Sequence, residues 1–160
     1  MRVIIARMAR RALQASVAAL LLAGSSAWAD GEVNVDTSGL ALKGYDPVAY
    51  VMDGKPTMGS AEFTATQGDA TYHFASANHR DMFLASPEKF TPQFGGYCSY
   101  GTTLSKKVDI DPMQFSVAGG KLYLNSSAQA QSLWLKDEPA NITKAKDAWM
   151  QIEHKAPGAL

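Results

Sequence analysis

Alternating polar and apolar positions predict two short strands in the middle of the chain, at residues 62–66 and 71–75. A turn-forming Gln-Gly-Asp triplet separates them, so we expect an antiparallel hairpin. Neighbouring side chains of a strand point to opposite faces, which places Tyr72 and Phe74 on one face. We expect this aromatic face to join the core and His73, on the other face, to lie in solvent.

Helix-start signals follow the hairpin directly. Ser76 is a good N-cap for a helix over residues 77–85, and Phe83 and Leu84 are its expected core residues. A Ser-Pro pair then begins a second short helix, because proline is favoured at the first helical position. Pro92 ends this second helix.

The stretch before the hairpin contains two turn signals. The first is Asp46, which precedes a proline and is therefore disfavoured in a helix. Residues 48–52 follow as a short strand or a turn of helix. Asp53-Gly54 is the second signal, and this dipeptide is typical of a hairpin.

The C-terminal part predicts a second hairpin and two more helices. Residues 114–118 and 121–125 read as strands about a Gly-Gly turn. Capping residues predict helices over 127–137 and 139–153. Apolar residues of the last helix recur at helical spacing, so one stripe packs inward.

These elements indicate an α+β fold with a small antiparallel sheet and packed helices. We find no internal repeat and no linker, so we expect one domain. Lys plus Arg and Asp plus Glu both number 15, and this neutral balance gives no electrostatic footprint for nucleic acid. The chain has one cysteine, which cannot form an intramolecular disulfide, so the fold depends on packing alone.

The first 29 residues have the pattern of a signal peptide. Four arginines precede a short apolar run at residues 12–23, which is too short to span a bilayer, and Ala27-Trp28-Ala29 is a small-x-small cleavage pattern. We therefore expect a periplasmic or secreted protein, cut near Ala29-Asp30, with no membrane span in its mature part. An arginine pair leaves twin-arginine export open beside general secretion. The expected domain covers residues 30–154, followed by a flexible tail at 155–160.

Cys98 is the leading candidate for chemistry. Its thiolate is a soft ligand for copper or zinc and also a redox nucleophile, whereas a buried cysteine acts as an inert small apolar residue. Gly95-Gly96 lets the backbone turn sharply before it. We expect this turn to bring the sulfur close to His79, which can bind a metal through either ring nitrogen.

Other polar and aromatic residues are candidates for a supporting role. Asp109 and Asp111 are possible oxygen ligands, although aspartates in such loops usually serve turns. We find no Ser-His-Asp spacing, nucleophile elbow, phosphate loop or dinucleotide fingerprint, so we do not expect an enzyme with a complete active site of its own. The residues expected to line a pocket or support the Cys/His site are His73, Tyr45, Asp46, Tyr97 and Tyr100.

Several motifs resemble, in order, those of the exported group of YHS-domain proteins. They are GYDPVAY at residues 44–50, GSAEF at 59–63, ATYHFASANHRDMFLASPEKF at 70–90, GGYCSYG at 95–101, KKVD at 106–109 and GKLYLN at 120–125. The resemblance implies a small fold related to treble-clef metal-binding domains, extended by C-terminal helices, and a role in binding metal, copper included.

The sequence departs from the short metal-binding version of that family at its ligand positions. Where that version has three cysteines, this chain has Ala49, Ala75 and His79. A site of three or four cysteines is therefore excluded, and a site built from Cys98 and His79 is what remains. Three hypotheses follow: a protein that handles copper or zinc, a single-cysteine redox protein that needs a partner thiol, and a binding module without metal that uses the aromatic surface around Tyr97 and Tyr100.

Overall fold

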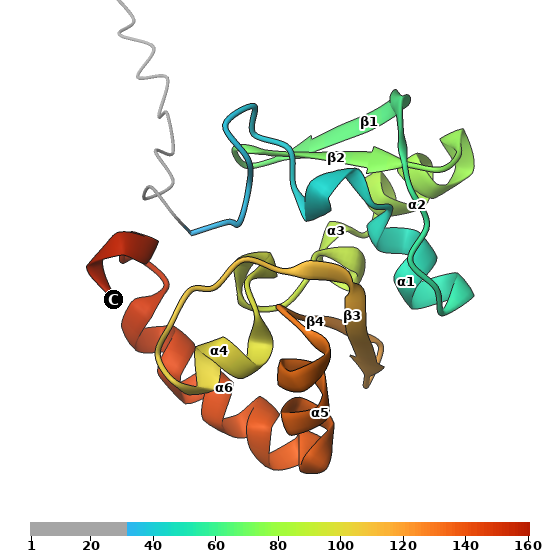
Figure 1. The fold of residues 1–160 in the computed structure, drawn as a ribbon. Helices are drawn as coiled ribbons and strands as arrows, with labels where there is room; N and C mark the ends of the chain where they lie inside the picture. The colour runs from blue at the N-terminus through green and yellow to red at the C-terminus, as the bar shows by residue number, and fades with distance from the viewer. Residues whose placement is uncertain (1–31) are drawn as a thin grey trace, which may run out of the picture.

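The computed structural model describes residues 32–160, so the expected signal peptide and its cleavage site lie outside the described residues. In this part the chain forms six α-helices and two antiparallel two-stranded sheets, which confirms the α+β class (Figure 1). The expected single small sheet is thus two separate hairpins.

The first half of the chain contains one hairpin between short helices. Its elements are the turn η1 (Leu42–Gly44), α1 (Pro47–Asp53), β1 (Ser60–Gln67), β2 (Ala70–Phe74), α2 (Ala77–Ala85) and α3 (Pro87–Phe90). The helix over 77–85 and its Ser76 cap are as predicted, because the Ser76 hydroxyl accepts from the His79 N–H.

The second half contains the other hairpin and the longest helix. Its elements are the turn η2 (Phe94–Gly96), α4 (Ser99–Thr103), β3 (Asp111–Ala118), β4 (Lys121–Asn125), α5 (Ala128–Lys136), α6 (Glu138–Ile152) and a terminal turn η3 (Pro157–Ala159). The predicted second hairpin and the two C-terminal helices are therefore present.

The two halves repeat the same order of elements, so the expectation of no internal repeat is wrong. Ser60 at the start of β1 corresponds to Asp111 at the start of β3, an offset of 51 positions, and α2 and α5 begin at the same offset. The hairpins also share their register, since Gln67 pairs with Ala70 and Ala118 pairs with Lys121. Both ladders are interrupted at the same place, near the start of the first strand.

Each half begins with a left-handed turn. In η1 the φ angles of Leu42, Lys43 and Gly44 are 54°, 52° and 83°, and in η2 those of Phe94, Gly95 and Gly96 are 54°, 61° and 77°. The positive φ at position 95 favours glycine. Glycine is also required there because a Cβ atom would lie 2.0 Å from the Glu32 carbonyl oxygen.

The main core is shared between the halves. The predicted aromatic face of β2 is buried, with Tyr72 1% and Phe74 0% exposed, and Leu122 and Leu124 of β4 join the same cluster. Phe83 is buried as expected. Leu84 is not, since its side chain is 56% exposed. One helix position is about 100° of rotation, so the helix that buries Phe83 turns Leu84 outward.

A smaller core lies between α6 and the second hairpin. Phe94, Tyr123, Trp134 and Ala145 form it, and partly buried residues that include Ile142 and Trp149 pack against them. The predicted apolar stripe of the last helix is therefore the face that packs inward.

Lys107 links the C-terminal end of α6 to Tyr97, which lies just before α4. Its ammonium donates to the carbonyls of Glu153 (2.6 Å) and Lys155 (2.7 Å), beyond the last turn of α6. The same nitrogen lies 5.4 Å from the centre of the Tyr97 ring and 5.0 Å from that of Trp149. A cation suits this position because a helix ends in unpaired carbonyls.

The Asp53-Gly54 signal does not form a hairpin. Asp53 is the last residue of α1, and Gly54, with φ of 66°, is the left-handed cap that ends this helix. An Asp-Gly pair fits either role, because both need a residue that tolerates positive φ.

Buried tyrosines predict loss of stability in alkaline solution. Burial raises the pKa of Tyr72 to about 12, and burial, aided by nearby negative charge, also raises the pKa values of Tyr50 and Tyr123. A raised pKa means that the folded state holds these protons more tightly than the unfolded state, whose tyrosines ionise near 10. This stabilisation is complete below about pH 10 and is lost above it, for Tyr72 at up to about 1.4 kcal/mol per pH unit until the pH reaches its folded-state pKa.

Urea unfolding between about pH 9 and 12 measures this loss, with absorbance at the phenolate band as a second readout. We expect the midpoint to fall as phenolate appears, and Tyr72→Phe to make the fall less steep. A midpoint that stays constant over this range contradicts the prediction.

Candidate functional site

A buried carboxylate, that of Asp46, joins three parts of the first half. Asp46 is 0% exposed and is the N-cap of α1, where Oδ1 accepts from the N–H groups of Val48 (2.8 Å) and Ala49 (3.2 Å). Pro47 fills the first helical position, which suits a residue without an N–H. The other oxygen, Oδ2, accepts from the Ala75 N–H at 2.8 Å, just before α2.

The same oxygen fixes the ring of His79. The distance from His79 Nδ1 to Asp46 Oδ2 is 2.6 Å, and the His79 side chain is 17% exposed. A carboxylate only accepts, so Nδ1 carries the proton and Nε2 of the neutral ring is left with its lone pair. His79 is therefore a ligand or base with one nitrogen committed and the other available.

The available nitrogen faces a second carboxylate. His79 Nε2 lies 4.0 Å from Oδ2 of Asp53, whose side chain is 43% exposed. Asp53 ends α1 and His79 lies in the first turn of α2, so the two helices bring an imidazole and a carboxylate together near the surface. Residues 32–160 contain no group of three or more His, Cys, Asp and Glu side chains suited to one metal ion.

Cys98 occupies a different environment. It is 2% exposed and is the N-cap of α4, where its sulfur accepts from the Gly101 N–H at 3.3 Å. The sulfur also lies 3.7 Å from Oδ1 of Asn125, which is itself fully buried. Asn125 Oδ1 in turn accepts from the Tyr100 N–H at 3.0 Å, so the thiol belongs to a closed polar network.

The structure does not bring Cys98 and His79 together. Helix α2, which carries His79, and helix α4, which Cys98 begins, lie in well-separated parts of the molecule (Figure 1). The expected approach of the sulfur to His79 is therefore wrong. The Gly95-Gly96 turn instead directs the chain into α4, beside β4, where Cys98 pairs with Leu124.

The internal repeat explains why the two candidates differ. Asp46 and Cys98 are corresponding residues, because each is the N-cap of the helix that follows a left-handed turn. The position that corresponds to His79 is Ala130, whose N–H bonds the Ser127 cap as that of His79 bonds Ser76. The His-Asp pair is thus present in the first half alone.

The remaining predicted supporting residues divide between the halves. Tyr45 is half-buried and packs against the main core, and His73 is half-buried rather than in solvent. Tyr97 is buried beneath Lys107, and Tyr100 lies on α4 beside Cys98. Asp46 is the one residue of this predicted set to which His79 hydrogen-bonds.

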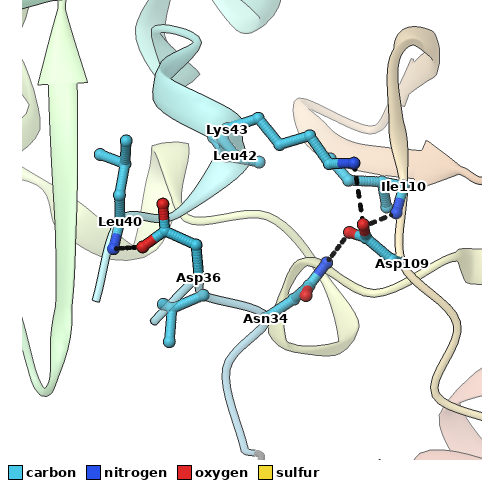
Figure 2. Close-up of a pocket in the computed structure, with 8 residues that line it drawn as sticks. Asn34, Asp36, Leu40, Leu42, Lys43, Asp109 and Ile110 are labelled. Atoms are coloured by element: carbon cyan, nitrogen blue, oxygen red, sulfur yellow. Dashed lines mark hydrogen bonds and ion pairs between the residues drawn. The ribbon is translucent and has the colours of Figure 1, made fainter. Parts of the chain in front are cut away.

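The predicted oxygen ligands Asp109 and Asp111 serve the structure. Asp109 accepts from Lys43 Nζ (2.8 Å), Asn34 Nδ2 (3.0 Å) and the Ile110 N–H (2.7 Å) at the edge of a small cavity (Figure 2). Partial burial alone would raise the pKa of Asp109, but these hydrogen bonds outweigh it and hold the pKa below its usual range. Asp111 accepts from the Met113 N–H at the start of β3.

This cavity is too small for most ligands. Its volume is about 90 Å³, room for a few water molecules. Its other carboxylate, that of Asp36, accepts from the N–H of Leu40 (Figure 2) and also from the N–H of Ser38. The cluster therefore ties the N-terminal segment to η1 and to the loop before β3.

Comparisons of the chain with protein-family models, curated proteins and solved structures gave no match. Within residues 32–160, no helix is both long and apolar enough to cross a membrane.

Removal of the Asp46 carboxylate should destabilise the fold strongly. In Asp46→Ala, three backbone N–H groups, two of them buried, lose their acceptor, and we expect a loss of about 3 kcal/mol in the free energy of unfolding. Asp53→Ala is the matched control, because Asp53 is exposed, and we expect a change within about 0.5 kcal/mol. Urea unfolding measures both, and equal effects of the two variants would contradict the assignment.

Cys98 should be protected in the native protein. Its burial and its network require a local opening before a reagent reaches the sulfur, so we expect modification about a hundredfold slower than in urea-unfolded protein. Thiol titration with a chromogenic disulfide measures both rates. Rapid reaction of the native protein would contradict this prediction, because it would show that the sulfur is accessible and reactive.

Proposed function

We propose that this protein binds a transition-metal ion, Cu(II) or Zn(II), through Nε2 of His79 with Asp53 as the second ligand. The observation that carries the proposal is the hydrogen bond of 2.6 Å between His79 Nδ1 and buried Asp46, which leaves Nε2 directed at Asp53. Imidazole and carboxylate are donors for Cu(II) and Zn(II), whereas Cu(I) prefers sulfur.

The separation of the two donor atoms suits a shared ion. Bonds of about 2.1 Å at a tetrahedral angle place two donors about 3.4 Å apart. The observed distance from Nε2 to Asp53 Oδ2 is 4.0 Å, and the Asp53 side chain is exposed and free to rotate. A small rotation of Asp53 is therefore enough to complete the pair.

Asp46 prepares His79 for this role. A carboxylate that accepts from the second ring nitrogen fixes the orientation of a metal-binding histidine and raises its basicity. Asp46 cannot rotate away, because its two oxygens also accept three backbone N–H groups. The ring orientation is thus set before an ion arrives.

Two protein ligands leave the other coordination positions to water or to a partner, so the ion exchanges readily. This property fits a protein that passes metal on rather than one that stores it. The resemblance to exported YHS-domain proteins and the signal-peptide pattern of residues 1–29 support a periplasmic or secreted location for this activity.

The burial of Cys98 weighs against the two alternatives that use its sulfur. A thiol that is 2% exposed and caps a helix is poorly placed to attack a partner disulfide or to accept an ion from solvent. The proposal therefore keeps the metal-handling function and replaces Cys98 by Asp53 in the ligand pair.

Calorimetric titration of the purified protein with Zn(II) and Cu(II) tests the ligand assignment. We expect one ion per chain, loss of detectable binding in His79→Gln, and affinity reduced about tenfold in Asp53→Asn, since removal of a carboxylate ligand weakens the site without abolishing it. Paramagnetic broadening by Cu(II) should first affect the amide signals of residues 53 and 79.

Two variants serve as controls. His73→Gln removes another half-buried imidazole of the first half, and Cys98→Ser removes the thiol. We expect both to bind the ion as the wild type does. Undiminished binding by His79→Gln, or loss of binding in Cys98→Ser, would reject the proposal.

A further inference from the structure

A cavity lies between the first hairpin, α3 and β4, and it is lined by none of the residues discussed above as metal ligands. Its volume is about 380 Å³, at the lower end of the range for small-molecule sites. Tyr72 and Val33 form its apolar part, and Gln67, Thr91, Gln93 and Lys121 are polar residues that surround it.

The internal repeat shows why this cavity exists. Tyr72 and Gln67 correspond to Tyr123 and Ala118 of the second hairpin, and there α6 covers the equivalent surface with Ile142 and Trp149. Helix α3 starts at the position equivalent to α6 but ends after four residues, at Phe90. The first hairpin therefore keeps a hollow that its counterpart fills.

Tyr72 brings an unused polar group to the cavity. Its side chain is 1% exposed, and its hydroxyl has no hydrogen-bond partner among residues 32–160. The one fully buried side-chain polar atom without a partner in this part of the chain is Ser99 Oγ, so the Tyr72 hydroxyl still touches the cavity space. A buried hydroxyl at the base of an apolar hollow favours a ligand that supplies its missing hydrogen bond.

The surroundings of the cavity favour a small molecule over a helix of another protein. A docked amphipathic helix needs an apolar surface on both sides of its groove. None of the exposed large apolar residues of the described chain lines this cavity. The charges at its edge come from Lys121 and Glu88, and because they balance, the cavity favours neither anions nor cations.

We propose that this cavity binds a compact, uncharged molecule with a single aromatic ring and a hydroxyl or carbonyl oxygen that bonds the Tyr72 hydroxyl. The ring occupies the apolar space that α6 fills in the second half, beside Tyr72 and Val33. His79 and Asp53 do not line this cavity, so the proposal can be tested independently of metal binding.

Phenol is the probe, with toluene and benzoate as its matched comparisons. Titration followed by amide chemical shifts should show phenol displacing the signals of residues 67, 72 and 91. We expect toluene, which lacks the oxygen, and benzoate, which is charged, to bind more weakly. Tyr72→Phe should lower the affinity for phenol about three- to tenfold and abolish the preference for phenol over toluene.

Two variants separate the cavity from general effects. Gln67→Trp places a large side chain at the edge of the cavity and should abolish binding of phenol, while Tyr123→Phe alters the corresponding tyrosine under α6 and should leave binding unchanged. Circular dichroism checks that each variant is folded. The proposal is overturned if no probe shifts the cavity signals, if Tyr72→Phe binds phenol as the wild type does, or if an amphipathic helical peptide binds there in its place.

Discussion

The buried carboxylate of Asp46 is the interaction on which the first half depends. It caps the N-terminus of α1, accepts a hydrogen bond from the Ala75 N–H between β2 and α2, and orients the ring of His79. A buried charge is costly unless hydrogen bonds surround it, and here four donors do so. One side chain therefore fixes the helix pair and the imidazole together, so the candidate metal site inherits its geometry from a structural requirement.

The second half meets the same requirement with weaker chemistry. Cys98 caps α4 with a sulfur, which is a poor acceptor, and the neighbouring Asn125 provides the oxygen that the Tyr100 N–H needs. The amide of Asn125 donates to Gln131, whose own amide donates to the Phe115 carbonyl. Several neutral groups thus provide the hydrogen bonds that a single carboxylate provides in the first half.

Local signals in the sequence predicted local structure well. The Ser76 cap, both hairpins about residues 62–75 and 114–125, and the inward stripe of the last helix depend on residues close in the chain. The partners of the candidate residues could not be predicted in this way. Asp46 and His79 are 33 positions apart, and Cys98 and Asn125 are 27 positions apart, so only the packed fold brings them together. The sequence does not reveal the repeat, because the two halves have few identical side chains at corresponding positions. Tyr45 with Tyr97 and Tyr72 with Tyr123 are two such pairs, whereas the order of backbone elements repeats throughout.

The matched backbones of the two halves also form a natural comparison of alternative side chains. At the N-cap of α1 and α4 the same turn carries the carboxylate of Asp46 or the thiol of Cys98. At the third residue of α2 and α5 the same helix start carries an imidazole in the first half and a methyl group in the second. The scaffold therefore does not require the chemistry that it carries at these places. A chain of this kind can lose a site, or gain one, by a few substitutions without rebuilding the frame that positions them.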